Sequence, residues 1–423
     1  MSIDAVVGAN WGDEGKGRMV DYLARDAAFV VRYQGGNNAG HTVVNDLGEF
    51  KLHLLPSGVF YPGVTNILGP GMVIDLEGLC DELDDLASKN IQPVIRISDR
   101  ATICFPFHRI EDGLEEARLG KDAYGSTLRG IAPAYGDRTV KKALQIGELL
   151  HPERFEKRLR QISNWKLERL EAFYGKKDIF SVDEMIEWAK KYGDRLREYV
   201  TDTTVLLEAA AKEGKNILFE AQLGTLRDLN FGIYPFTTSS CTLASYAPIG
   251  SGLMGYPLDT VLAVVKAFST CVGEGPFVAL MDKEEGDALR ISAHEFGAST
   301  GRPRTIGHFD AVATRYGVKM QGATEVALTK LDCLSGKKTL KICTRYAWQG
   351  KEYADFPLNA VLEEATPVYM EVPGWDEDVT QVRRYEDLPE AARNYVEEIE
   401  KLIECPLRYV SVGPEREALI VRN

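Results

Sequence analysis

A glycine-rich segment near the start of the chain constrains the fold more than any other part of the sequence. The stretch GANWGDEGKGR, residues 8–18, follows an apolar run at residues 3–7 and precedes a predicted helix at residues 18–25. In such a strand–loop–helix unit, glycines let backbone N–H groups point at an anion, and the helix N-terminus adds its positive dipole end. Lys16 brings a full positive charge to the same place. The segment therefore predicts a phosphate-binding loop on an α/β sheet.

Two features distinguish this loop from an ordinary P-loop. Asp13 and Glu14 stand within it, and Gly17 occupies the position where a Ser or Thr hydroxyl normally reaches Mg²⁺. Carboxylates beside a polyphosphate would repel it, so we expect a metal ion or a chemical step to use them. The alternative is a glycine turn with a solvated acidic pair.

Composition narrows the classes of partner. The 423 residues are 44% hydrophobic and carry a net charge of −13, without a basic run of the kind that grips nucleic acid. The seven cysteines form no CxxC pair, which argues against a zinc site or a disulfide framework. No apolar run approaches the ~18 residues of a membrane span, and no leader-like segment precedes the first strand. We therefore expect a cytoplasmic protein that binds neither nucleic acid nor membrane.

Short β-rich runs alternate with helical patterns along the chain, which favours a mostly parallel central sheet with helices on both faces. A helix at residues 388–404 would pack an apolar face on this sheet. No linker brackets the charge-rich helical segment at about residues 152–214, so we expect one domain over residues 1–423 with a helical insertion there. Strands are predicted at residues 3–7, 29–33, 66–68, 217–220, 260–267, 324–329, 340–346 and 407–412.

A second polar loop, QGGNNAGHT at residues 34–42, follows the strand predicted at residues 29–33. Two glycines, two amides, a His and a Thr in nine residues are costly to order without a ligand. His41 can exchange a proton or donate to a phosphate near neutral pH. A lone His is more often structural, but its place in a glycine loop beside a phosphate loop favours a functional role.

The residues TKLD at 329–332 end an apolar strand, at the carboxyl edge where open α/β sheets bind ligands. Asp332 can accept from guanine N1–H and the 2-amino group together, whereas adenine offers no such pair of donors. Lys330 can lie along the base plane, and SVGP at residues 411–414 would supply a second wall. Alone this pattern is weak, but together with a phosphate loop it predicts GTP.

The stretch FGASTGRPR at residues 296–304 joins small residues to two arginines. Guanidinium groups bind carboxylates and phosphates bidentately, so Arg302 and Arg304 predict a small dicarboxylate or a phosphate as the guest. A solvated basic loop is the alternative.

Together these four segments resemble the adenylosuccinate synthetase family, the GTP-dependent ligases of purine synthesis that join IMP to aspartate. The motifs WGDEGKG, QGGNNAGHT, TKLD and SVGP occur in the family's order, and the likeness runs from residue 3 to about residue 422. The resemblance implies a P-loop-NTPase-related α/β fold, a homodimer, Mg²⁺ as cofactor and GTP as co-substrate. IMP, or a related nucleoside monophosphate, and L-aspartate would be the other substrates.

The resemblance also implies residue roles. Asp13 would remove the purine N1 proton and bind Mg²⁺ together with Gly40, while His41 and Lys16 would assist phosphoryl transfer. GTP would be held by Gly12, Gly15, Lys16, Gly17, Thr42, Lys330, Asp332, Ser411, Gly413 and Pro414. IMP and aspartate would be met by Asn38, Thr127, Lys141, Leu223, Thr238, Val272, Ser299, Thr300, Arg302 and Arg304.

Several departures from the family pattern lie on the acceptor side. At residues 219–225 the chain has FEAQLGT where the family usually has FEGAQGT, so Leu223 replaces the glutamine that touches the purine. Gln222 sits one place earlier and on a strand would face the other way. Further departures are Ala132, Lys141, Phe231 and Thr305.

These departures leave two alternatives to an IMP–aspartate ligase. One is a paralogue that adds aspartate to a different oxo-purine nucleotide, such as a guanylate-like acceptor. The other is a non-catalytic GTP-binding regulator, which would not need both Asp13 and His41.

Overall fold

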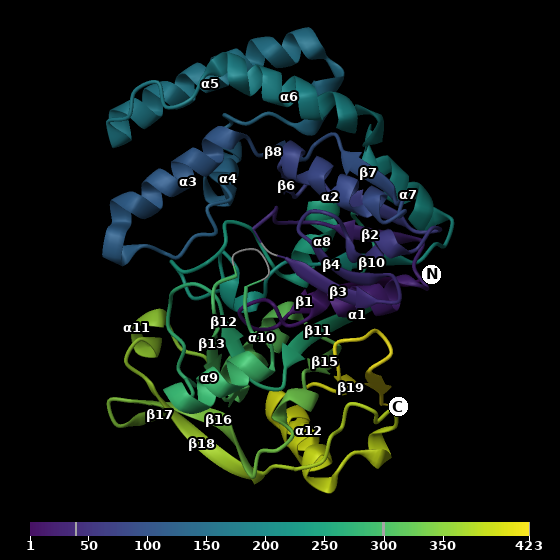
Figure 1. Cartoon of the computed structure of the whole chain (residues 1–423), viewed down its shortest axis with the longest axis vertical. Helices are drawn as coiled ribbons and strands as arrows, with labels where there is room; N and C mark the ends of the chain where they lie inside the picture. The colour runs from purple at the N-terminus through teal and green to yellow at the C-terminus, as the bar shows by residue number, and fades with distance from the viewer. Residues whose placement is uncertain (39, 298–300, 423) are drawn as a thin grey trace.

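The computed structural model describes residues 1–38, 40–297 and 301–422. A ten-stranded sheet runs through its middle in the order β20-β19-β15-β11-β1-β10-β2-β5-β7-β9 (Figure 1). Neighbouring strands pair in parallel throughout, except that β20 runs antiparallel to β19. The strands are Leu419–Val421, Leu407–Ser411, Glu325–Thr329, Thr260–Lys266, Ile3–Gly8, Ile217–Glu220, Phe29–Arg32, Thr65–Leu68, Val94–Ser98 and Val200–Thr201 in that order.

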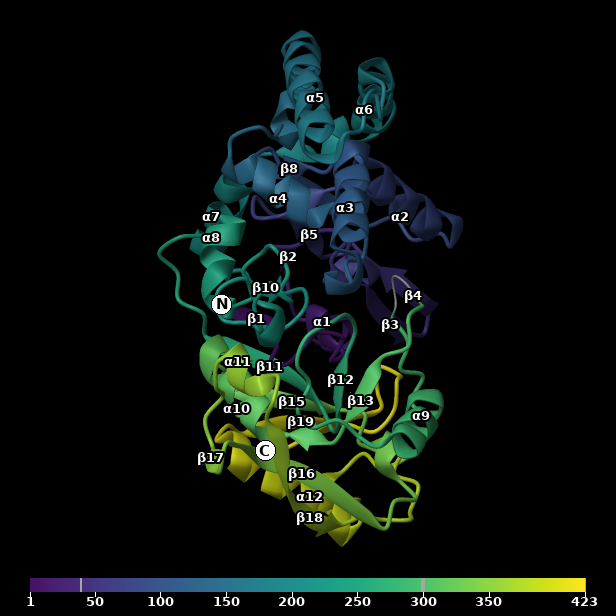
Figure 2. The same cartoon turned by 90° about the vertical axis from the view of Figure 1, so that its left-hand side faces the viewer.

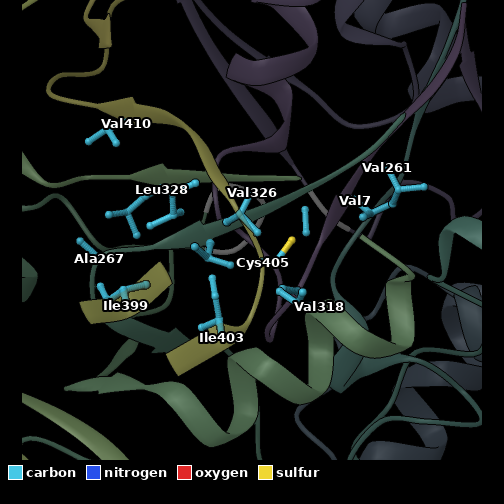
Figure 3. Packing of buried hydrophobic residues seen from close by; sticks show 14 of the residues in the cluster. Val7, Val261, Ala267, Val318, Val326, Leu328, Ile399, Ile403, Cys405 and Val410 are labelled. Atoms are coloured by element: carbon cyan, nitrogen blue, oxygen red, sulfur yellow. The ribbon is translucent and has the colours of Figure 1, made fainter. Parts of the chain in front are cut away.

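Helices cover both faces of this sheet. On one face, Met19 and Val20 of α1 (Lys16–Ala24) pack on Val6, Val30 and Val264. On the other face, α12 (Glu390–Ile403) presents Ile399 and Ile403 to Val326 and Leu328 of β15, and Val318 of α10 (Ala311–Gln321) lies beside them (Figure 3). Because both faces are buried, the central strands are near-continuous apolar runs. The predicted α/β class is therefore confirmed, and α12 agrees with the helix predicted at residues 388–404.

A helical part of the chain lies at the end of the molecule opposite α12 (Figure 2). It contains α2 (Leu76–Ser88), α3 (Pro106–Leu119), α4 (Ile131–Thr139), α5 (Pro152–Tyr174) and α6 (Val182–Leu196). The segment expected to form the insertion also contributes β9 and α7 (Thr203–Lys212), and β9 pairs with β7 at the sheet edge. The segment thus contains α5, α6 and α7, and its last part returns to the central sheet.

One predicted strand lies in a different sheet from the others. Residues 340–346 fall in β16 (Thr339–Trp348), which pairs with β14 (Phe309–Asp310), β17 (Lys351–Tyr353) and β18 (Thr366–Pro373). Polar residues alternate with apolar ones along β16, so one of its faces can meet solvent, as antiparallel pairing allows. Its strand character is confirmed, but it is not part of the parallel sheet.

The remaining elements are short. They are β3 (His41–Asn45), β4 (Gly48–Leu52), β6 (Val73–Ile74), β8 (Thr102–Ile103), α8 (Ala247–Ser251), β12 (Ser269–Cys271), α9 (Lys283–Ser292), β13 (Thr305–Gly307) and α11 (Asn359–Leu362).

No helix among the described residues is long and apolar enough to cross a membrane.

Candidate active site

The predicted phosphate loop connects β1 to α1 at the middle of the sheet. Gly15 precedes the helix with φ 104° and Gly12 has φ 100°, conformations that favour glycine. Within the described residues, no side chain forms a capping hydrogen bond at the N-terminus of α1. Because the first N–H groups of a helix have no partner within the helix, this end offers donors to an anion. The strand–loop–helix prediction is confirmed.

Glu14 shapes this loop, contrary to our expectation that a metal ion or a chemical step would use both carboxylates. Its side chain is buried and accepts hydrogen bonds from the backbone N–H groups of Asn10 (3.1 Å) and Gly12 (2.8 Å). Its other oxygen lies 2.7 Å from Nζ of Lys16. The Glu14 side chain therefore turns into the loop and stabilises its curvature. The sequence alone could not show this orientation.

His41 begins β3 and packs against the phosphate loop. Its Nδ1 contacts the carboxylate of buried Glu220, which also accepts hydrogen bonds from the Ser57 backbone N–H (2.7 Å) and hydroxyl (2.8 Å). Nε2 has no hydrogen-bond partner within the described residues. Burial lowers the pKa of the His41 imidazole, although Glu220 acts in the opposite direction. Glu220 thus orients the ring and leaves Nε2 available to a ligand.

The contact with His41 explains why the loop has Gly17 in place of a hydroxyl residue. A Cβ atom at Gly17 would lie 2.7 Å from Cβ of His41. Real Cβ atoms do not approach this closely, so only glycine fits between α1 and β3. The departure from the ordinary P-loop pattern is therefore the condition for placing His41 against the loop.

Asp13 lies at the opening of the loop, with φ 61° and a partly exposed side chain. Its Oδ2 lies 2.9 Å from Nη2 of Arg304, whose Nη1 lies 2.5 Å from Glu295. Glu295 is completely buried and also contacts Nζ of Lys266 and of Lys330, each at 2.7 Å. Burial alone would raise the pKa of Glu295, but these three cations hold it well below its usual range. One carboxylate thus connects Arg304 to Lys330, a link that sequence reasoning missed.

A cavity of about 750 Å³ opens beside the phosphate loop. It brings together predicted site residues from widely separated stretches of the chain. Those that line it are Gly12, Asp13, Asn38, Gly40, Thr127, Leu223, Thr238, Val272, Arg302 and Arg304. Lys141 is exposed and lies outside this lining, and Ser299 and Thr300 lie outside the described residues.

Leu223 faces this cavity, whereas Gln222 faces away from it, as predicted. The Gln222 amide is fully buried and forms two hydrogen bonds with the backbone of Gly36, accepting from N–H (3.0 Å) and donating to C=O (2.8 Å). A Cβ at Gly35 would lie 1.7 Å from Gln222 Oε1, so Gly35 is required there. Leu223 has φ 60°, an unusual conformation for a bulky residue, and packs on Gly12. Gln222 therefore braces the loop before His41 and cannot reach the cavity.

The other departures from the family pattern differ in their distance from the cavity. Ala132 lines it. Phe231 is 45% exposed and, like Thr305, stands outside the lining. Among the apolar departures, Leu223 and Ala132 are the two that a ligand in the cavity would meet.

The residues predicted to hold guanine gather where β15 and β19 end side by side. The backbone N–H of Leu331 donates to the C=O of Ser411 (3.2 Å), which joins the TKLD and SVGP segments. Burial raises the pKa of Asp332, and its Oδ1 has no hydrogen-bond partner in the part of the chain that the structure describes. A buried acceptor without a donor suits the paired N–H groups of guanine. Thr42, predicted to help hold GTP, is exposed on the opposite face of β3 from His41.

The residues present fit a magnesium ion that arrives with a polyphosphate. Asp13 and Gly40 both line the cavity, and one carboxylate with one carbonyl suits Mg²⁺, which takes further oxygens from phosphates and water. No group of three or more His, Cys, Asp or Glu side chains within residues 1–38, 40–297 and 301–422 could hold a metal alone.

Comparison with known proteins identifies the family. The family model for adenylosuccinate synthetase matches residues 5–420. Adenylosuccinate synthetase 2 of Pseudoalteromonas translucida is 52% identical over 418 residues, covering 99% of each chain. A fully ligated adenylosuccinate synthetase from Plasmodium falciparum superposes with a TM-score of 0.94 at 31% identity, covering 100% of both chains.

A more distant structure shares the fold alone. The succinoaminodeoxyadenylate synthetase of cyanophage S-2L, bound to dGMP and dATP, superposes with a TM-score of 0.61 at 17% identity, covering 99% of this chain and 95% of that one. The full-length family match and the 52% identical relative carry the assignment. This chain belongs to the adenylosuccinate synthetase family.

Proposed function

We propose that this chain is a GTP-dependent ligase that joins IMP and L-aspartate to form adenylosuccinate, GDP and phosphate. The observation that carries the proposal is the cavity beside the phosphate loop, which Asp13, Leu223 and Arg304 line together. The cavity thus places a base, Asp13, and an arginine able to bind a carboxylate, Arg304, around a space that a purine can fill. This space lies beside the phosphate loop of the nucleotide site.

The chemistry requires a base beside the purine. The oxygen at carbon 6 is a poor leaving group, so it must first become a phosphate ester. We assign Asp13 as the group that takes the N1 proton, which makes that oxygen nucleophilic toward the γ-phosphoryl group of GTP. Arg304 contacts Asp13 in this structure, with its Nη2 2.9 Å from Oδ2 of the carboxylate.

His41 and Lys16 stabilise charge during phosphoryl transfer. The Glu220 carboxylate holds Nδ1 of His41, so Nε2 is the atom that can carry a proton to a phosphate oxygen. Lys16 lies in the loop, paired with Glu14, within reach of an anion at the α1 N-terminus. Mg²⁺, held by Asp13 and Gly40, would neutralise charge on the phosphates.

Aspartate completes the reaction. We assign Arg302 and Arg304 to its carboxylates, since both line the cavity and guanidinium groups bind carboxylates bidentately. The aspartate amine then attacks carbon 6, forming a C–N bond, and the phosphate ester leaves as inorganic phosphate. Ser299 and Thr300 stay predicted aspartate contacts.

The assembly and location follow from the family. We propose a cytoplasmic homodimer in which Lys141, exposed on the surface here, reaches the partner's nucleotide site. The single-domain organisation of residues 1–423, with the helical insertion at about residues 152–214, stays a prediction.

Replacing Asp332 with Asn is expected to shift nucleotide choice from GTP toward xanthosine triphosphate. The amide can donate to a 2-oxo group, whereas the carboxylate accepts from the 2-amino group of guanine. One reversed hydrogen-bond pair changes the ratio of kcat/KM values by about 1–3 kcal/mol, roughly 5- to 150-fold. Competition between the two triphosphates measures the ratio, and an unchanged GTP preference would remove Asp332 from the base site.

The proposed function is tested with a panel of acceptors. Purified protein is given GTP, L-aspartate and, separately, IMP, GMP and dGMP, and succinylated product is measured by mass spectrometry. We expect adenylosuccinate from IMP with ordinary efficiency. Efficient product from a guanylate and little from IMP would favour the paralogue, for which Leu223 in the cavity is the supporting observation. GTP binding without turnover for any acceptor would favour the regulator.

A further inference from the structure

Arg227 is a buried cation in the acceptor cavity that the reaction described above does not use. It ends a short 3₁₀ turn (Thr225–Arg227) soon after β10, is 7% exposed, and lines the cavity. No carboxylate forms an ion pair with it among the described residues, although buried charges are usually paired. Its direct hydrogen-bond partners are therefore neutral groups.

The guanidinium fastens two separate loops. Nη1 donates to the carbonyl oxygens of Phe236 and of Glu274, the latter at 2.9 Å. Nη2 donates to the carbonyl of Val272 and contacts Sγ of Cys271, both at 2.8 Å. One planar side chain thus donates to three carbonyls in a fixed fork geometry, which a flexible ammonium does not provide.

Both loops carry residues of the acceptor site. The backbone N–H of Thr238 donates to the carbonyl of Arg227 (2.8 Å), and the Thr238 hydroxyl faces Asn38 at 3.5 Å. Val272 lines the cavity directly. A Cβ at Gly125 would lie 3.3 Å from Cα of Gly273, so the loop before Thr127 packs on the segment that Arg227 holds.

We propose that Arg227 is a positioning residue for the acceptor nucleotide: it locks Val272 and Thr238 into one wall and adds positive charge where a nucleoside monophosphate dianion binds. This inference rests on the proposed function. The dianion would be attracted by the positive charge of Arg227, and the fixed wall would hold the purine for attack.

Arg18 provides a matched comparison on the GTP side. It is also 7% exposed and also donates to backbone carbonyls, those of Glu415 (2.8 Å) and Ala418 (2.7 Å). These carbonyls belong to the loop that follows Ser411. Arg18 and Arg227 thus have similar burial and similar partners, but they support different substrate sites.

The test compares Arg227→Gln, Arg227→Lys and Arg18→Gln in the full-length protein, measuring KM for each substrate and the thermal midpoint. We expect Arg227→Gln to raise KM for IMP by about 10- to 100-fold and to leave KM for GTP within about twofold. Arg18→Gln should give the opposite split. Arg227→Lys, which keeps the charge but loses the planar fork, should lie between wild type and Arg227→Gln.

Three outcomes would overturn the inference. In the first, KM for IMP stays unchanged in Arg227→Gln. In the second, Arg227→Gln raises KM for IMP and KM for GTP together. In the third, Arg227→Gln and Arg18→Gln change both KM values in the same way, in proportion to the fall in their thermal midpoints. Turnover by the wild-type protein distinguishes a failure of this inference from a failure of the proposed function. If wild type fails with IMP but accepts another nucleoside monophosphate, the proposed function is wrong, and the same KM comparison with that acceptor still tests Arg227.

Discussion

Replacing Asp13 with Asn is expected to lower kcat by ~10³-fold or more while GTP affinity stays within about threefold. The amide cannot take the N1 proton, but it keeps an oxygen that can accept from Arg304, now 2.9 Å from Asp13. Asn also tolerates the φ of 61° at this position, so the loop should keep its shape. The loss should therefore come from chemistry.

A matched control is available for this substitution. Asp178 also has a positive φ, 47°, but it is exposed between α5 and α6, far along the chain from the site. Asp178→Asn should keep wild-type turnover. Steady-state kinetics and equilibrium GTP binding measure both variants, and activity of Asp13→Asn within tenfold of wild type would remove Asp13 from the mechanism.

Replacing His41 with Asn is expected to lower kcat by a similar factor, ~10³-fold, because the proton donor to the phosphate oxygen is lost. Glu220→Gln should cost less, about 10- to 100-fold, since it acts through the imidazole. Glu220 raises the pKa of His41 against the lowering effect of burial. Removing its charge should lower that pKa further, so the loss of kcat with rising pH should begin at a lower pH.

Ser57→Ala is the control for Glu220. It removes one hydrogen bond to that carboxylate, from the hydroxyl at 2.8 Å, but keeps the negative charge. The pH–kcat profile should therefore stay close to that of wild type. An unchanged profile in Glu220→Gln would contradict the role given to the His41–Glu220 pair.

Much of the site could be predicted because its motifs are continuous in the sequence. The phosphate loop, the loop that ends at His41 and the TKLD segment each combine a strand end with residue types that suit one ligand. Gln222 points away from the cavity as predicted, but β10 ends at Glu220, so the strand alternation given as the reason does not extend to it. The comparisons then confirmed the family and the α/β fold.

The remainder depends on contacts between distant parts of the chain. Glu220 meets His41 across 179 positions, and Glu295 reaches Lys330 across 35, so no local pattern reveals either pair. Glu14 belongs to the predicted loop, but its sequence does not say whether the carboxylate turns inward or toward a ligand. Arg227 was missed for the same reason, because its carbonyl partners come from two later loops.

The central claim, that GTP phosphorylates the purine oxygen before aspartate displaces it, is tested most directly by isotope transfer. IMP labelled with ¹⁸O at carbon 6 is incubated with the protein, GTP, Mg²⁺ and L-aspartate, and the inorganic phosphate is analysed by mass spectrometry. If the purine oxygen is phosphorylated first, the phosphate should carry one ¹⁸O atom for each adenylosuccinate formed. Adenylosuccinate formed together with unlabelled phosphate would contradict this order of steps.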